Sequence, residues 1–228
     1  MNGKVLAITG AMGALGKIVA DTAQARGARV AGIDHAAAQS AARPDRIELG
    51  GVDLTDAGQA STAIDAVLAH FGRLDALINI AGGFVFETVA EGGEKSWQRM
   101  HAMNVLTALN ASRAALPHLA KGGAGRIVNI GAMAALQAGA GLAPYAASKA
   151  GVHRLTEALA AEWMGKVTVN AVLPSIIDTA ANRASMPNAD FTKWVRPLEL
   201  AEVILFLASD GASAVTGALI PVTGRLRG

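Results

Sequence analysis

A tyrosine and a lysine lie four residues apart in the segment Tyr145-Ala-Ala-Ser-Lys149. Residues at this spacing share one face of a helix, so the phenol and the ammonium would project side by side. A phenol can give a proton to a reacting oxygen or take one from it, and a neighbouring ammonium lowers the phenol pKa toward the working range. The spacing predicts a proton-transfer pair, although a solvated helix face could carry the same two residues.

A glycine-rich turn follows the first apolar run of the chain, residues 5–9. Glycines between a strand and a helix let the backbone approach a pyrophosphate, and the helix N-terminus offers free N–H groups to it. This order of elements predicts a dinucleotide site rather than a turn that is rich in glycine by chance. The expected contacts in the turn are Gly10, Met12, Gly13, Ala14, Leu15 and Gly16.

The next apolar run ends at Asp34, 18 residues after Gly16 and just before His35. A carboxylate there can accept hydrogen bonds from the ribose hydroxyls and would repel a 2′-phosphate. No Lys or Arg lies beside it or in the glycine turn, so we expect NAD(H) to be preferred to NADP(H). The residues at or just after the ends of the next two apolar runs are further expected cofactor contacts, although they could also be ordinary turn residues. They are Asp53, Leu54, Asn79, Ala81 and Gly82.

Short aliphatic runs alternate with longer amphipathic segments along the whole chain. The expected strands are residues 5–9, 29–34, 47–52, 74–80, 126–130, 167–173 and 219–222. The expected helices are residues 14–26, 56–71, 94–119, 144–163 and 198–208. This alternation predicts an α/β fold with a doubly wound, parallel, seven-stranded Rossmann sheet and helices on both faces. We expect one domain, residues 1–228, with a substrate lid around residues 175–197.

Composition excludes several other classes of protein. The 228 residues are 52% hydrophobic, 17% charged and free of cysteine, which rules out disulfides and thiolate metal sites. The five histidines are dispersed, and we expect no metal. With a net charge of +2 and scattered basic residues, we expect no nucleic-acid partner. No apolar run reaches membrane-spanning length, so we expect a cytoplasmic protein with a small-molecule substrate.

These motifs together resemble the short-chain dehydrogenase/reductase family over essentially the whole chain. The matching residues are Thr9, Gly10, Gly16, Asp53, Asn79, Ala81, Gly82, Asn104, Tyr145 and Lys149. The resemblance implies that Tyr145 is the general acid/base and that Lys149 binds the nicotinamide ribose. It also implies that Asn104 holds a relay water. The segment beside the nicotinamide would contribute Pro174, Ile176, Ile177 and Thr179. Helices 94–119 and 144–163 would pair between subunits, giving a homodimer or homotetramer.

One position departs from the family. Where the family places a catalytic serine, 13 residues before Tyr145, this chain has Ala132. Loss of such a hydrogen-bond donor typically costs about 3 kcal/mol of transition-state stabilisation. The same alanine, the segment around His153 and the string from Met186 to Trp194 resemble quinoid dihydropteridine reductase, which uses NADH. A conjugated, electron-poor acceptor depends less on that donor than a ketone does.

Three readings of the function therefore stay open. The first is hydride transfer from NADH to a conjugated carbonyl or imine-like acceptor of dihydropteridine type. The second is a general alcohol dehydrogenase or ketone reductase weakened by Ala132. The third is a non-redox sensor or isomerase that binds NAD. Around the substrate we expect Phe84, Met133 and Trp194, with Trp194 in the lid and Trp97 in the core.

Overall fold

The computed structural model describes residues 1–226, and the last two residues of the predicted domain 1–228 lie outside that description. Seven parallel strands form one sheet in the order β3-β2-β1-β4-β5-β6-β7. The strands are β1 (Val5–Thr9), β2 (Arg29–Ile33), β3 (Arg46–Leu49), β4 (Ala76–Asn79), β5 (Gly125–Ile130), β6 (Val167–Pro174) and β7 (Leu219–Val222). The predicted parallel sheet is confirmed.

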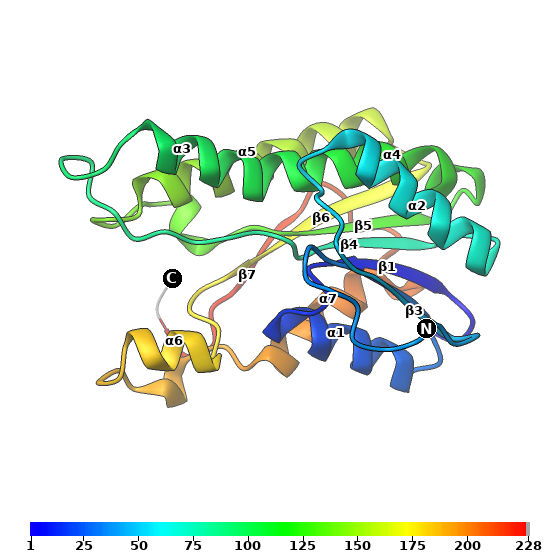
Figure 1. The fold of residues 1–228 in the computed structure, drawn as a ribbon, viewed down its shortest axis with the longest axis horizontal. Coiled ribbons are helices and arrows are strands. Elements are labelled where there is room, and N and C mark those ends of the chain that lie inside the picture. The colour runs from blue at the N-terminus through cyan, green and yellow to red at the C-terminus, as the bar shows by residue number, and fades with distance from the viewer. Residues whose placement is uncertain (227–228) are drawn as a thin grey trace.

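Helices cover both faces of this sheet. They are α1 (Ala14–Ala25), α2 (Ala57–Phe71), α3 (Glu94–Met100), α4 (Thr107–Lys121), α5 (Ala143–Glu162), α6 (Ala180–Ser185) and α7 (Pro197–Leu207). Figure 1 shows α2, α4 and α5 above the sheet and α1 and α7 below it. The prediction of a doubly wound α/β fold is therefore also confirmed. Within residues 1–226, no helix combines the length and the apolar character that crossing a bilayer requires.

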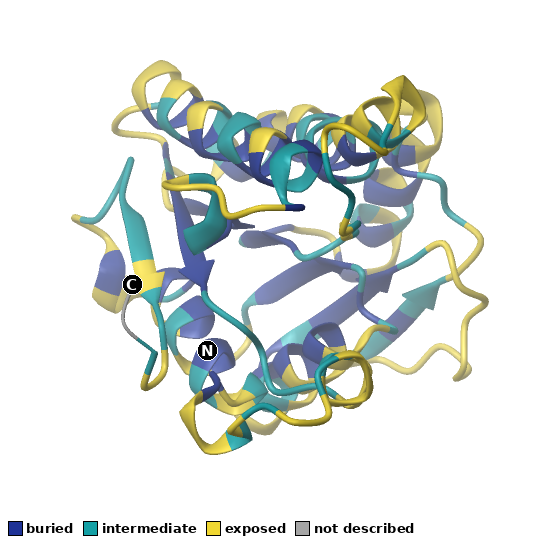
Figure 2. Cartoon of the chain, turned by 90° about the vertical axis from the view of Figure 1, so that its left-hand side faces the viewer, coloured by how far each residue is buried: buried dark blue, intermediate teal, exposed yellow. Residues whose placement is uncertain are grey.

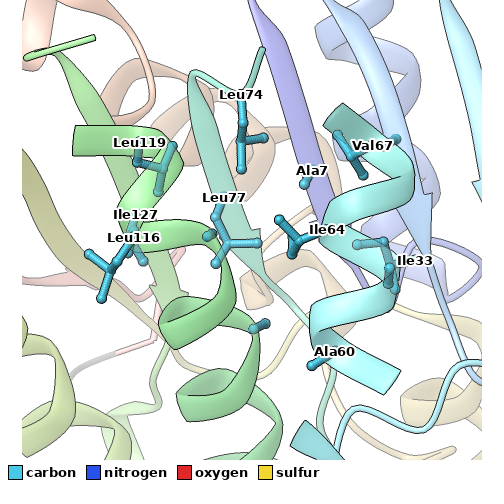
Figure 3. Packing of buried hydrophobic residues seen from close by; sticks show 14 of the residues in the cluster. Ala7, Ile33, Ala60, Ile64, Val67, Leu74, Leu77, Leu116, Leu119 and Ile127 are labelled. Atoms are coloured by element: carbon cyan, nitrogen blue, oxygen red, sulfur yellow. The ribbon is translucent and has the colours of Figure 1, made fainter. Parts of the chain in front are cut away.

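The central strands are mostly aliphatic because helices bury both of their faces. All five residues of β1 are buried, whereas the edge strands β3 and β7 are only partly buried. Most exposed residues in Figure 2 lie on the outer faces of helices and in loops. In Figure 3, Ile64 of α2 and Leu116 of α4 pack with Leu77 of β4 in one of two apolar clusters. A second cluster fills the space between the sheet and α1 with α7. These two layers hold the strand ends in place.

The order of the strands reverses between β1 and β4. From β1 the chain runs outward through β2 to β3, and it then returns to place β4 on the other side of β1. In such sheets the ligand crevice lies outside the carboxyl ends of the strands at this switch point. The two strand ends are tied together here, because the Thr9 hydroxyl accepts hydrogen bonds from the N–H groups of Ile80 and Ala81, both at 3.1 Å.

Two segments differ from the sequence-based expectation. The single helix expected over residues 94–119 is α3, a π-helix (His101–Leu106) and α4 in succession. The expected lid, residues 175–197, contains α6 and a short 3-10 turn (Phe191–Lys193), and a parallel bridge joins Ile177 to Val195. The hydrophobic period of a π-helix differs little from that of an α-helix over one turn, so the sequence pattern did not separate them.

Candidate active site

The glycine turn brings β1, α1 and β4 together. Gly10 has a φ of +66°, and a Cβ atom there would lie 2.8 Å from the backbone N of Ala81, so no other residue fits. Helix α1 begins after Gly13 with no side-chain cap and no acidic residue in its first turn. Its first N–H groups and the positive end of its dipole remain available to an anion.

A cavity of about 560 Å³ opens above this turn. Most of the expected cofactor residues line it: Gly10, Met12, Gly13, Ala14, Leu15, Gly16, Asp34, His35, Asp53, Leu54, Ala81 and Gly82. Further residues that the sequence motifs did not indicate also line the cavity: Ala36, Gln39, Val52, Thr55, Ile80, Met103 and Thr107. The size of the cavity and its uncapped helix end fit a dinucleotide with its pyrophosphate on α1.

Asp34 fixes the shape of the adenosine end of the cavity. Its carboxylate accepts hydrogen bonds from the N–H of Met12 at 2.8 Å and from the N–H of Ala36 at 3.0 Å. The carboxylate therefore holds the glycine turn against the loop that follows β2. Asp53 accepts hydrogen bonds from the hydroxyl and the N–H of Thr55, and these bonds hold its pKa below the usual range. The Asp53 carboxylate is thus ionised at neutral pH and can accept further hydrogen bonds.

Asn79 does not line the cavity. Its side-chain amide donates to the Ser112 hydroxyl at 3.1 Å and to the side-chain Oδ1 of Asn129 at 2.8 Å. Asn129 in turn donates to the Thr156 hydroxyl at 2.9 Å. This chain of buried bonds joins β4 and β5 to α4 and α5. Asn79 positions the strand ends, whereas Ala81 and Gly82 beyond it reach the cavity.

Lys149 of α5 lies directly behind the cavity wall. Its side chain is buried, its Nζ donates to the carbonyl oxygen of Ile130 at 2.8 Å, and burial lowers its pKa to about 8. A Cβ atom on Gly82 would lie 3.5 Å from this Nζ. Because Gly82 lines the cavity, α5 presents its ammonium where the β4 end meets the cavity.

Tyr145 departs from the electrostatic expectation. Burial raises its pKa to about 12, whereas the sequence analysis expected the ammonium of Lys149 to lower it. The cause is the loss of hydration that a buried phenolate would suffer. The phenol therefore carries a proton at neutral pH. Its ring lies edge-on to that of Phe84, with the ring centroids 4.9 Å apart.

Asn104 lies in the π-helix, a type of helix that is common at functional sites. Its amide donates to the Ser148 hydroxyl at 2.9 Å and to the carbonyl oxygen of Gly83 at 3.1 Å, and its own carbonyl accepts from the N–H of Gly83 at 2.9 Å. The Ser148 hydroxyl donates to the carbonyl oxygen of Tyr145 at 2.7 Å. Ser148 of α5 thus connects Asn104 to the backbone of Tyr145.

Ala132 follows β5 and is buried, with a methyl group where the family has a hydroxyl. Its own N–H points to the imidazole of His153, with the N···Nε2 distance at 3.3 Å. Neither the side chain nor the backbone of residue 132 therefore has a donor free for a substrate oxygen. The neighbouring Met133 begins a 3-10 turn and is partly exposed.

The predicted place of Trp97 is wrong, because its side chain is 45% exposed on α3 rather than in the core. The seven residues of α3 are too few to show from the sequence which face is buried. Trp194 lies in the segment expected to form the lid, but it is only 2% exposed and packs on Phe191 with ring centroids 4.8 Å apart. It does not line the cavity, and its contact with the substrate stays a prediction.

The segment after β6 folds back beside the strand ends. Pro174 ends β6, the carbonyl oxygen of Ile176 accepts from the N–H of Val195 at 2.9 Å, and Ile177 pairs with Val195. The Thr179 hydroxyl caps α6 by accepting from the N–H of Asn182 at 3.2 Å. These residues do not line the cavity, and their contact with the nicotinamide stays a prediction.

A glycine-lined cavity at the switch point of a parallel sheet, with a Tyr–Lys helix beside it, is the arrangement of a dinucleotide-dependent oxidoreductase. The profile of the family described as short chain dehydrogenase matches residues 4–190, and the chain belongs to that family. It is thus an NAD(P)H-dependent enzyme.

Curated relatives cover nearly the whole chain. A 3-oxoacyl-[acyl-carrier-protein] reductase of Thermotoga maritima is 31% identical, over 99% of this chain and 98% of the relative. D-threitol dehydrogenase of Mycolicibacterium smegmatis is 32% identical, over 98% of this chain and 93% of the relative. These proteins share the family with this chain but differ from one another in the substrate that they name.

Solved structures agree in fold. Ligand-free aldohexose dehydrogenase of Thermoplasma acidophilum superposes with a TM-score of 0.89 at 27% identity, covering 99% of this chain and 94% of that chain. ElxO with NADP bound gives a TM-score of 0.89 at 26% identity, covering 98% of both chains. Because a neighbour binds NADP, family membership alone does not select NADH for this chain.

Proposed function

We propose that this enzyme transfers hydride from NADH to a conjugated carbonyl or imine-like acceptor, of which a quinonoid dihydropteridine is the type. The observation that carries this proposal is the lack of a free hydrogen-bond donor at Ala132. The side chain there has no donor, and the N–H is directed to His153. A simple ketone needs a donor to polarise its oxygen, whereas an electron-poor conjugated ring accepts hydride with little help.

In this proposal Tyr145 donates the proton. Burial raises its pKa to about 12, so the phenol carries its proton at neutral pH but is a weaker acid than a free phenol. The positive charge of Lys149 favours the phenolate and so assists the transfer of this proton. When bound, NADH supplies the hydride to the acceptor, and the phenol proton goes to the heteroatom that gains the negative charge. Lys149 holds the nicotinamide ribose, and its charge offsets the phenolate that remains until solvent returns a proton. Asn104 keeps the π-helix against the tyrosine helix and positions the relay water.

The preference for NADH rests on the adenosine end of the cavity. The Asp34 carboxylate lies in the lining, and the described lining residues include no Lys or Arg to neutralise a 2′-phosphate. A phosphate there would face an uncompensated negative charge. Lower Michaelis constants for NADPH than for NADH would overturn this part of the proposal.

The second candidate is reduction of ordinary ketones, which the names of the curated relatives favour. Absorbance at 340 nm can follow NADH consumption with a quinonoid dihydropterin, quinones, cyclic imines, diketones and simple ketones. The proposal predicts that conjugated acceptors exceed simple ketones in kcat/KM by at least about tenfold. Preference for a simple 3-oxo ester would support the second candidate instead. A non-redox role requires that no acceptor is reduced while NADH still binds.

We also propose that the enzyme is a cytoplasmic homodimer or homotetramer in which α4 and α5 pair across a two-fold axis. Both helices carry more small and apolar residues than one buried stripe requires. The whole chain would then act as one domain, with residues 175–197 closing over the substrate. Light scattering at micromolar concentration tests the assembly, and a mass of one chain would overturn it.

A further inference from the structure

The buried histidine His153 lies on the same face of α5 as the two predicted active-site residues. It comes four residues after Lys149 and eight after Tyr145. Its side chain is 2% exposed, and it lies against the end of β5. A histidine is seldom buried without a hydrogen-bonding role, because its ring carries two polar nitrogens.

The imidazole accepts a backbone hydrogen bond from residue 132. The N–H of Ala132 donates to Nε2 at 3.3 Å, which requires an unprotonated Nε2. Burial, with the charges of Arg154 and Lys149, lowers the pKa of His153, so the ring is neutral. The contact fixes the first peptide after Gly131.

The same ring fills the space of a side chain at residue 131. A Cβ atom built on Gly131 would lie 2.5 Å from Nε2 and 2.8 Å from Cδ2 of His153. The φ of Gly131 is not positive, so the backbone itself would tolerate alanine. Gly131 and His153 therefore form a complementary pair in which the small residue makes room for the ring.

These contacts anchor the loop between β5 and α5, residues 131–142. At its far end, the carbonyl oxygen of Gly141 accepts from the N–H of Glu87 at 2.9 Å, and the ring of Phe86 lies against Gly141. Exposed apolar side chains lie on this loop and on the segment that follows β4: Leu136 is 57% exposed and Phe86 is 66% exposed. The loop leads into the first turn of α5, which holds Tyr145, and His153 fixes the other end of the loop at Ala132.

We propose that His153 is a positioning residue that fixes the β5–α5 loop for substrate, through its neutral Nε2 on the N–H of Ala132 and its fit against Gly131. This inference rests on the proposed function only in that it takes residues 131–142 to form one side of the substrate site. It does not depend on which acceptor is reduced. The imidazole does not line the cavity, and its described hydrogen bond goes to Ala132, so its loss should alter substrate binding and leave cofactor binding nearly unchanged.

A matched pair of variants isolates the hydrogen bond. In His153→Gln the amide oxygen reaches as far as Nε2 and can accept the same bond, whereas His153→Met has equal length and no comparable acceptor. With the best acceptor of the wild type, His153→Met should raise KM by about fivefold or more, as expected for a buried N–H without an acceptor. His153→Gln should recover most of this loss, and the Kd for NADH should stay unchanged in both.

A second comparison tests the fit to Gly131. Gly131→Ala should impair acceptor KM in the presence of His153 and have a much smaller effect in a His153→Ala background, because the clash is gone. Equal effects of Gly131→Ala in both backgrounds would overturn the pairing. Equal KM values for the Gln and Met variants, or a parallel loss of NADH affinity in both, would overturn the positioning role.

Hydrogen exchange separates this inference from the proposed function. In the cofactor-free enzyme, without any acceptor, His153→Met should speed amide exchange in the peptide that covers residues 131–142, and His153→Gln should not. Unchanged exchange in the Met variant would overturn the inference even if dihydropterin reduction is found. Failure of wild-type enzyme to reduce dihydropterins, with faster exchange in the Met variant, would overturn the proposed acceptor alone.

Discussion

Replacing Lys149 by methionine should change how the stability of the cofactor-free protein depends on pH. The ammonium is buried, its Nζ donates to the carbonyl oxygen of Ile130, and burial lowers its pKa from 10.5 to about 8. Between these two values the unfolded chain binds a proton that the folded chain has released. Stability therefore rises with pH across this interval, because the unfolded state binds more protons there.

The magnitude follows from the displacement of the pKa. A shift from 10.5 to about 8 corresponds to about 3 kcal/mol against the folded state at neutral pH. By about pH 10 most of this cost is gone, so wild type should gain about 2 kcal/mol relative to Lys149→Met between pH 7 and about pH 10. Tyr145 acts in the opposite sense, but its raised pKa removes stability only above about pH 10.

Urea unfolding of both proteins at several pH values from 7 to about 10 measures this difference. Methionine preserves the length and apolar stem of the lysine, and Lys166→Met, at an exposed position, is the control. The free energy of unfolding of the control should follow that of wild type at every pH. If the curves of wild type and Lys149→Met run parallel from pH 7 to about pH 10, Lys149 is not a desolvated ammonium, and the electrostatic argument fails.

Three further substitutions test other parts of the structure. Asp34→Ala should raise the ratio of kcat/KM for NADPH to that for NADH by about tenfold or more, since it removes the charge that faces a 2′-phosphate; an unchanged ratio would contradict this. Ala132→Ser should raise simple-ketone reduction by about tenfold or more by restoring a donor, and no gain would show that the donor is not limiting. Trp194→Ala should lower the free energy of unfolding by about 3–5 kcal/mol, because the ring is 2% exposed. Denaturant unfolding measures this loss, and a loss below about 1 kcal/mol would contradict the burial of the ring.

The sheet could be predicted because most of its strands are short, largely aliphatic runs, and the central ones are buried on both faces. For β1 and β7 the first and last residues of the aliphatic run are also the first and last residues of the observed strand. The π-helix around Asn104 could not be predicted, since one extra residue in a turn leaves the pattern of apolar residues almost unchanged. The six-residue helix α6 is too short to show a period, and it lies in a segment of mixed polarity.

Within the site, the glycine turn and Asp34 could be placed because strand, turn and helix follow one another in the sequence. The inward direction of Asn79 could not, because a strand buried on both faces has no polar alternation to indicate the side on which a residue lies. The pKa of Tyr145 was misjudged for a related reason. Spacing along a helix shows which charge is near, whereas burial, which here has the larger effect, depends on the tertiary structure.

Tyr145→Phe tests most directly whether the phenol on α5 delivers a proton beside the cofactor cavity. The substitution removes one oxygen and keeps the ring on Phe84. NADH-dependent turnover with the best conjugated acceptor should fall by at least about a hundredfold, while the Kd for NADH, from fluorescence titration, should change by less than about twofold. Turnover equal to that of wild type would contradict the assignment of the proton donor.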